Sequence, residues 1–186
     1  MAYVKDTKIY RRLFSVIVEN EPGVLARVSG LFSARGFNIV SLAVGETQDP
    51  TISRITIVVD GTASVLEQVN KQLNKLIPVI SVLPIIDQDM LAIELTLAKF
   101  RPGPRVRAVV EDAKRKGDDI EIVHEGPSGV IVRIIAAVEK EPAIFKELGE
   151  LELIEICRTG KVALSKTRTF GIFDKSQREV EVEEAN

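Results

Sequence analysis

The sequence predicts an α+β fold made of two βαββαβ units, each an antiparallel sheet with its helices on one face. Short apolar runs of strand length alternate with apolar stripes at helical spacing. A Pro-Gly pair, at residues 22–23 and again at 102–103, separates a predicted strand from a predicted helix. A glycine ends each of these two helices, Gly36 in the first half and Gly117 in the second. This repeat indicates two similar domains joined near residues 88–90.

The first unit has four predicted strands, at residues 10–20, 37–46, 52–60 and 78–86, all rich in Ile, Val and Leu. Its two helices are predicted from apolar stripes, which consist of Val24, Leu25, Val28, Leu31 and Phe32, and then of Val65, Leu66, Val69, Leu73 and Leu76. Thr62 stands where a residue that caps the second helix is expected. The resulting order is βαββαβ.

The second unit repeats this order. Strands are predicted at residues 91–99, 120–123, 130–138 and 151–157, the last clear strand of the chain. One helix carries Val106, Val109, Val110 and Ala113, and a short one covers residues 142–148. We expect one domain over residues 10–87 and a second, ferredoxin-like domain over residues 90–173. The charged tail, 174–186, reads as a solvated terminus or as an edge strand in which Glu and Val alternate.

Composition excludes several classes of protein. The 186 residues include 25 basic and 27 acidic side chains, a net charge of −2, so a dedicated nucleic-acid binder is not expected. The basic run 114–116 fits a helix end, where cations offset the helix dipole. No apolar run spans a bilayer, and residues 1–12 lack the apolar core of a signal peptide. A single cysteine fits a reducing compartment, so we expect a cytoplasmic protein without membrane contact.

Catalytic chemistry is not evident in the sequence. The one histidine, His124, has no sequence neighbour to form a triad or a metal site and is expected at the surface. Cys157 lies inside a predicted strand, which favours a buried structural thiol over a nucleophile. Neither a Walker loop nor a dinucleotide fingerprint is present. We therefore predict no catalytic residues, no metal site and no cofactor in this chain.

The loop at residues 19–25 is the best candidate for a ligand site. A helix start leaves backbone N–H groups unpaired and partly positive, which suits a carboxylate. Pro22 fits the first helical position, and donors are expected from Gly23, Val24 and Leu25. Asn20 before the helix and Asn38 after it can both donate and accept hydrogen bonds. The purely structural alternative is that Asn20 caps the helix, the Pro-Gly pair forms a turn and Asn38 satisfies a local backbone group.

Several segments carry a family resemblance: RLFSV at 12–16, ENEPGVLARV at 19–28, RGFNI at 35–39, DPTISR at 49–54 and RTG at 158–160. They closely resemble the small regulatory subunit of acetolactate synthase (acetohydroxyacid synthase), a family with an ACT domain. The likeness is dense over residues 10–86 and thinner but collinear to about residue 166. It implies an N-terminal ACT domain followed by the C-terminal ferredoxin-like domain.

The resemblance also implies a ligand and a homodimer. ACT domains of such subunits pair side by side, and valine binds between them for feedback inhibition. The matching positions are Asn20, Gly23, Val24 and Leu25 in one chain, with Asn38 and Ile39 expected from its neighbour. The second domain, whose loop at 101–104 departs from the family pattern, receives no ligand.

The implied partner is the large catalytic subunit of acetolactate synthase, which carries thiamine diphosphate, Mg²⁺ and FAD. It condenses pyruvate with pyruvate or 2-oxobutyrate in the biosynthesis of valine, leucine and isoleucine. The small subunit is expected to activate it and to transmit inhibition. The alternative is a stand-alone amino-acid-responsive ACT regulator, for instance of transcription, which would need a DNA-reading element.

Overall fold

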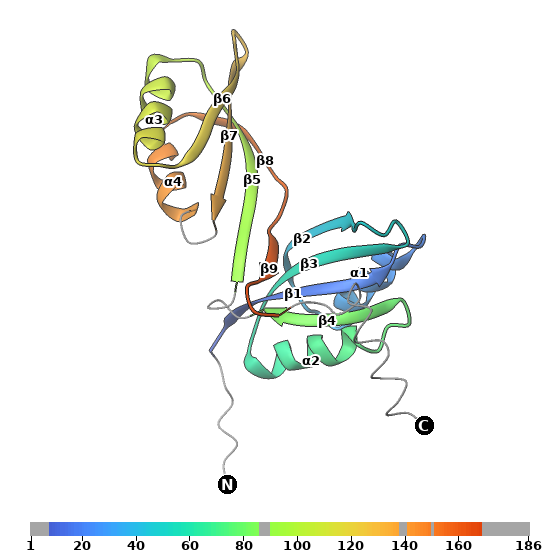
Figure 1. Cartoon of the computed structure of the whole chain (residues 1–186). Helices are drawn as coiled ribbons and strands as arrows, with labels where there is room; N and C mark the ends of the chain where they lie inside the picture. The colour runs from blue at the N-terminus through green and yellow to red at the C-terminus, as the bar shows by residue number, and fades with distance from the viewer. Residues whose placement is uncertain (1–7, 86–89, 138–140, 150, 169–186) are drawn as a thin grey trace, which may run out of the picture.

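The first half of the chain forms a four-stranded antiparallel sheet in the strand order β2-β3-β1-β4. The computed structural model describes residues 8–85, 90–137, 141–149 and 151–168. The elements of the first half are β1 (Tyr10–Glu19), α1 (Val24–Ala34), β2 (Ile39–Glu46), β3 (Ile52–Gly61), α2 (Ala63–Leu73) and β4 (Val79–Ile85). Both helices cover the same face of the sheet (Figure 1). The predicted βαββαβ order is confirmed.

Strand alternation directs every second residue of β1 toward the helices. Phe14 and Val16 pack there against Val28 and Phe32 of α1, and all four side chains are almost fully buried. Thr62 caps α2 as expected, because its hydroxyl accepts a hydrogen bond from the amide of Val65 at 3.4 Å. The apolar stripes of the sequence therefore identify the buried faces of both helices.

The second half repeats the topology with the strand order β6-β7-β5-β8. Its elements are β5 (Met90–Phe100), α3 (Pro104–Arg115), β6 (Asp119–Gly126), β7 (Gly129–Ala137), α4 (Glu141–Leu148) and β8 (Leu153–Arg158). The α+β fold of two βαββαβ units is thus confirmed. None of the helices among the described residues is long and apolar enough to span a membrane.

The strand predicted at residues 151–157 is found as β8 (Leu153–Arg158), but it is not the last strand of the chain. A further strand, β9 (Val162–Ser165), pairs antiparallel with the beginning of β5, Leu164 opposite Leu91. Four residues are too few to show a period, and the partner lies about seventy residues earlier in the chain, so local pattern gave no signal. Leu151 instead closes α4, because its amide donates to the carbonyl of Leu148 at 2.9 Å.

The two halves meet through a small apolar cluster. Leu13, Val58 and Ile85, on the sheet face turned away from α1 and α2, pack against Ala92 of β5 and Ala163 of β9. Of the predicted boundary near residues 88–90, residues 88 and 89 lie outside the described residues, as do the predicted domain end at 173 and the tail 174–186, and β5 begins at Met90. The junction is therefore described by contacts on either side of the boundary.

Candidate functional site

The start of α1 presents free backbone donors. Gly23 takes a left-handed conformation, with φ of 87°, and stands as the N-cap without a side-chain hydrogen bond. Its carbonyl accepts a hydrogen bond from the backbone amide of Arg27 at 3.0 Å, and the backbone amide of Val24 donates to the carbonyl of Glu21 at 3.3 Å. Among the described residues, no hydrogen bond takes up the amides of Gly23, Leu25 or Ala26. These amides can donate hydrogen bonds to an anion at the positive end of the helix.

The space in front of Gly23 is open. A Cβ placed on this glycine would meet no heavy atom within 4 Å. The left-handed φ is one that side-chain-bearing residues rarely adopt, which gives a physical reason for glycine at this position. A ligand can therefore approach the first turn of α1 along its backbone.

Pro22 does not occupy the first helical position, which corrects the sequence interpretation. The helix begins at Val24, and Pro22 lies in the turn before the glycine cap. The left-handed conformation of Gly23 changes the chain direction between Pro22 and the helix. A helix with Pro22 as its first residue would require a different turn. Of the expected amide donors, that of Val24 is already engaged.

Asn20 does not cap α1. Its side-chain amide donates to Glu46 Oε1 at 3.1 Å and to the carbonyl of Pro50 at 2.9 Å, and its backbone amide donates to Thr51 at 2.7 Å. The structural alternative of the sequence analysis is therefore wrong on this point. Asn20 ties the end of β1 to the β2–β3 turn and so positions the loop that leads to Gly23.

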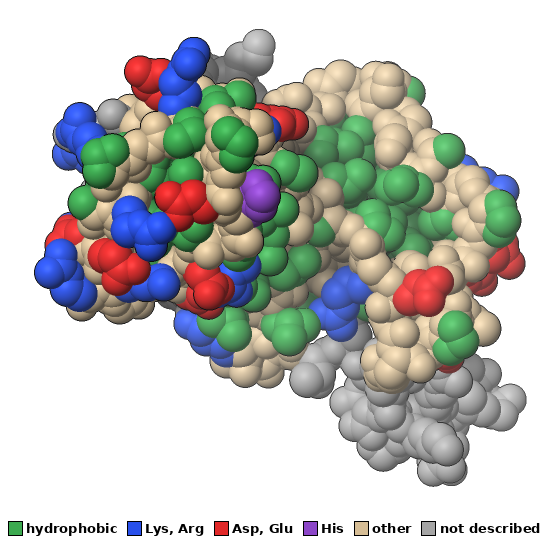
Figure 2. All heavy atoms as spheres, turned by 90° about the horizontal axis from the view of Figure 1, so that it is seen from above, with side chains coloured by type: hydrophobic (Ala, Val, Ile, Leu, Met, Phe, Trp, Pro, Cys, Tyr) green, Lys and Arg blue, Asp and Glu red, His purple; other side chains and the backbone are tan. Residues whose placement is uncertain are grey.

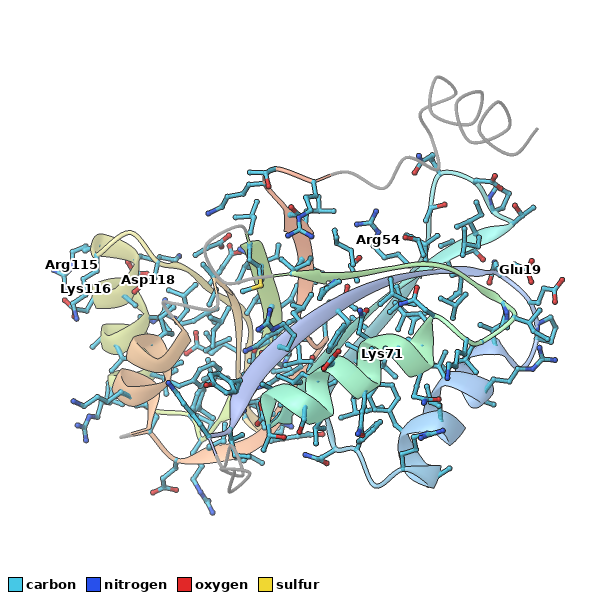
Figure 3. The ribbon with its side chains drawn as sticks, turned by 90° about the horizontal axis from the view of Figure 1, so that it is seen from below. Glu19, Arg54, Lys71, Arg115, Lys116 and Asp118 are labelled. Carbon is cyan, nitrogen blue, oxygen red and sulfur yellow. The ribbon has the colours of Figure 1, made fainter. Side chains whose placement is uncertain are left out.

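Two of the candidate side chains point in opposite directions. Val24 is only 4% exposed and packs in the core, so a ligand meets at most its backbone. Leu25 is 43% exposed and supplies an apolar side chain beside the free amides. Glu19 lies at the tip where β1 ends (Figure 3) and, with the exposed Glu21, surrounds this turn with negative charge.

Asn38 and Ile39 lie at the far end of β2 from this loop. Ile39 pairs with Val59 of β3, whereas Glu46, which contacts Asn20, pairs with Ser53. Seven residues of extended strand separate the two ends by about 24 Å. One chain therefore does not bring Asn38 and Ile39 to the start of its own α1.

An apolar cleft of about 410 Å³ opens between the two halves of the chain. Its walls include Val44 of β2, Leu91 and Ile93 of β5, and Leu164 of β9. Figure 2 shows green, apolar side chains in the hollow between the two lobes. The sequence predicts the alternation of β5. It does not predict that the apolar residues of β5 face those of β2 in a cleft, because these strands are distant in the sequence.

Arg54 of β3 reaches the rim of this cleft. It points away from α1 and α2 (Figure 3). Partial burial lowers the pKa of its guanidinium, because removal from water disfavours the charged form. The group stays cationic at neutral pH, since an arginine side chain does not deprotonate in proteins.

Charged and reactive groups elsewhere do not form a second site among the described residues. No group of three His, Cys, Asp or Glu side chains could hold a metal ion there. His124 is exposed, as expected. Cys157 is also exposed, which contradicts the expected buried thiol, because it lies opposite the exposed Leu97 and the residues of β8 face solvent. Lys116, at the outer end of α3 in Figure 3, pairs with Asp112 at 2.8 Å.

Comparison with known proteins gives consistent matches. Residues 14–81 match the model of the "AHAS small subunit-like ACT domain". The acetolactate synthase small subunit of Haemophilus influenzae is 41% identical over 84% of this chain and 96% of its own length. The small subunit of acetolactate synthase isozyme 3 of Escherichia coli is 38% identical with the same coverage. The crystal structure of the acetolactate synthase small subunit of Thermotoga maritima superposes with a TM-score of 0.74 at 34% identity, covering 86% of this chain and 99% of that one.

Proposed function

The chain belongs to the acetolactate synthase small-subunit family, and from this membership we propose that it is the non-catalytic regulatory subunit of an acetolactate synthase. It binds valine as a feedback effector and raises the activity of a separate large subunit. That partner carries out the condensation of pyruvate and holds thiamine diphosphate, Mg²⁺ and FAD. Both proteins work in the cytoplasm, in the biosynthesis of the branched-chain amino acids.

The observation that carries this proposal is the set of free amides at the start of α1. The amides of Gly23, Leu25 and Ala26 have no hydrogen-bond acceptor among the described residues, and the space before Gly23 is open. A carboxylate is the acceptor that best matches clustered N–H groups at a helix N-terminus. An α-amino acid provides that carboxylate together with an ammonium group, for which Glu19 and Glu21 supply nearby negative charge.

A second copy of the chain completes the site. β2 is an edge strand, with β3 as its neighbour in the sheet, so its other edge can pair with the β2 of another chain. In an antiparallel pairing about a two-fold axis, the Glu46 end of one β2 lies beside the Ile39 end of the other. This arrangement would place Asn38 and Ile39 of the partner beside the start of α1, which one chain alone cannot do.

The apolar side chain of valine is accommodated by Leu25 of one chain and Ile39 of the other. Leu25 is exposed and Ile39 half-buried in the single chain, so both retain surface for a ligand. Leucine and isoleucine differ from valine by one methylene, a difference of about 1–3 kcal/mol in an apolar pocket. Discrimination among the three effectors is therefore modest.

Feedback inhibition follows from a difference in valine affinity between two arrangements of the dimer. Valine binds more tightly to the arrangement that supports the large subunit less well. A coupling free energy on the order of 1–3 kcal/mol corresponds to a 5- to 150-fold effect. The coupling is reciprocal, so the large subunit weakens valine binding by the same factor.

The proposal is tested by reconstitution. The chain alone, incubated with pyruvate, thiamine diphosphate, Mg²⁺ and FAD, should form no acetolactate. Addition of the chain to the large subunit of the same organism should raise acetolactate formation, and valine should lower it again. Acetolactate formed by the chain alone contradicts the non-catalytic role, and activation that valine leaves unchanged contradicts the effector site.

A further inference from the structure

A short turn at Arg158–Lys161 connects the second domain directly to the edge strand β2 of the first. We infer that this turn is the contact through which an effector bound beside β2 acts on the C-terminal domain. The inference rests on the proposed function, because it assigns a route to the regulation exerted from that same site. Its two key residues, Gly160 and Ser41, act by positioning the domains and do not touch the ligand.

Two residues of the turn, Thr159 and Lys161, bond to different domains. The amide of Thr159 donates to the carbonyl of Leu95 at 3.0 Å, and the amide of Leu95 donates to the Thr159 hydroxyl at 3.2 Å, which anchors the turn on β5. Two residues later, the amide of Lys161 donates to the hydroxyl of Ser41 on β2 at 2.9 Å. The turn therefore holds β2 and β5 at a fixed separation. The connection from β8 to β9 passes beside β2 in Figure 1.

Gly160 makes the close approach possible. Its φ is +80°, and a Cβ on it would lie 3.0 Å from both the carbonyl oxygen of Leu42 and the hydroxyl oxygen of Ser41. Such a Cβ would force the turn and the backbone of β2 apart by a few tenths of an ångström. The left-handed backbone and the lack of room both require glycine here. By contrast, Gly117 has a φ of +88° with open space around it.

The attachment point on β2 lies next to the proposed ligand residues. Ile39 pairs with Val59 and Ser41 pairs with Val58, so the register shifts between them and Val40 is the extra residue of a bulge. A ligand held by Asn38 and Ile39 thus acts on a strand segment that is two residues from Ser41. A bulge leaves one residue unpaired and locally disrupts the ladder, so this part of β2 is held by fewer ladder hydrogen bonds than the rest of the strand.

Among the described residues, the rest of the domain junction is small. The apolar cluster between the domains contains five buried residues there, against twelve in the first domain core and thirteen in the second. Two of the five are the alanines Ala92 and Ala163, which bury little area. The orientation of the C-terminal domain therefore depends on the polar contact at Ser41 as well as on apolar packing.

The test compares Gly160→Ala with Gly117→Ala in the full-length chain. Both variants place alanine in a left-handed conformation, but only the first adds a contact against β2. We expect valine to bind both isolated variants with wild-type affinity by calorimetry. In the holoenzyme, the factor by which saturating valine lowers activity should fall at least about fivefold in Gly160→Ala and stay unchanged in Gly117→Ala.

Ser41→Ala provides a second, milder variant in case Gly160→Ala folds poorly. It removes the acceptor of Lys161 without adding any atom, and it should reduce valine inhibition in the same direction. Hydrogen exchange adds a readout that needs no ligand: the Lys161 amide should be protected in the wild type and should exchange about tenfold faster or more in both variants.

The possible failures are distinguishable. A wild-type chain that binds no valine removes the proposed effector site and the premise of this inference with it. A wild type that binds valine, together with Gly160→Ala and Ser41→Ala variants that retain full inhibition, overturns the inference alone. A Lys161 amide that exchanges in the wild type at the rate of an unstructured peptide also overturns it, because the contact itself is then missing.

Discussion

Replacement of Gly23 by aspartate should weaken valine binding through charge, and asparagine at the same position provides a matched control. Both side chains have the same shape, and both tolerate the left-handed backbone better than most residues do. Neither would meet a heavy atom of the same chain within 4 Å of its Cβ. The two variants therefore differ in one unit of negative charge beside the free amides of α1.

The size of the effect follows from Coulomb's law. A carboxylate on residue 23 would lie roughly 5 Å from an effector carboxylate bound at the same helix start. In the range of effective dielectric constant between bulk water and a protein surface, this repulsion is about 1–3 kcal/mol. Gly23→Asp should thus bind valine about 5- to 150-fold more weakly than Gly23→Asn.

Loss of folding does not explain such a difference. Aspartate at an N-cap interacts favourably with the helix dipole, so the aspartate variant should unfold at a temperature no lower than that of the asparagine variant. Calorimetric titration with valine and thermal unfolding of both variants provide the measurements. Equal valine affinities in the two variants would refute a carboxylate site at this helix, and wild-type affinity in both would place the effector elsewhere.

Three further changes test other parts of the structure. Asn38→Ala should weaken valine binding by about 1–3 kcal/mol while sedimentation still shows a dimer; monomers would instead assign Asn38 to dimer formation. Thr62→Ala should lower the free energy of unfolding by about 1 kcal/mol in urea titration, since it removes the cap of α2, and an unchanged midpoint would contradict that role. The hydrogen bond from Arg11 lowers the pKa of the Asp60 carboxyl group in the folded protein. The pair therefore stabilises the fold fully at pH values above the pKa that Asp60 has in the unfolded chain. This stabilisation is lost as the pH falls through the lower pKa of the folded state. Because both side chains are partly exposed, Asp60→Asn should cost at most about 1 kcal/mol at neutral pH and nothing once the carboxylate is protonated, as unfolding at a series of pH values will show.

Local pattern was sufficient for most of the fold. The apolar runs that became β1 and β3, and the helical stripe around Val28 and Phe32, are properties of residues one to four positions apart. Thr62 could be recognised as a cap for the same reason, because the backbone amide that donates to its hydroxyl lies three residues away, on Val65. Such signals are complete within a segment, and two segments of the same order predict two units of the same topology.

The candidate site was only partly predictable. The glycine at position 23 and the helix that follows it were visible in the sequence, because a helix start has a local signature. The partners of Asn20 were not, since Glu46 lies 26 residues away and the β2–β3 turn approaches only after the sheet has formed. The expectation that Pro22 opens the helix fails because the sequence does not show that Gly23 has a positive φ, which places the helix start after the glycine.

By itself, the sequence determined two βαββαβ units, their buried faces and the open helix start at Gly23, because each of these depends on near neighbours along the chain. Only the tertiary structure decided that Cys157 is exposed, that β9 pairs with β5, and that Lys161 bonds to Ser41 across 120 residues. Contacts of this kind depend on how whole sheets pack and on which strand lies at an edge. Their free energy is gained only when both sheets are formed, and no periodicity of either partner segment encodes it.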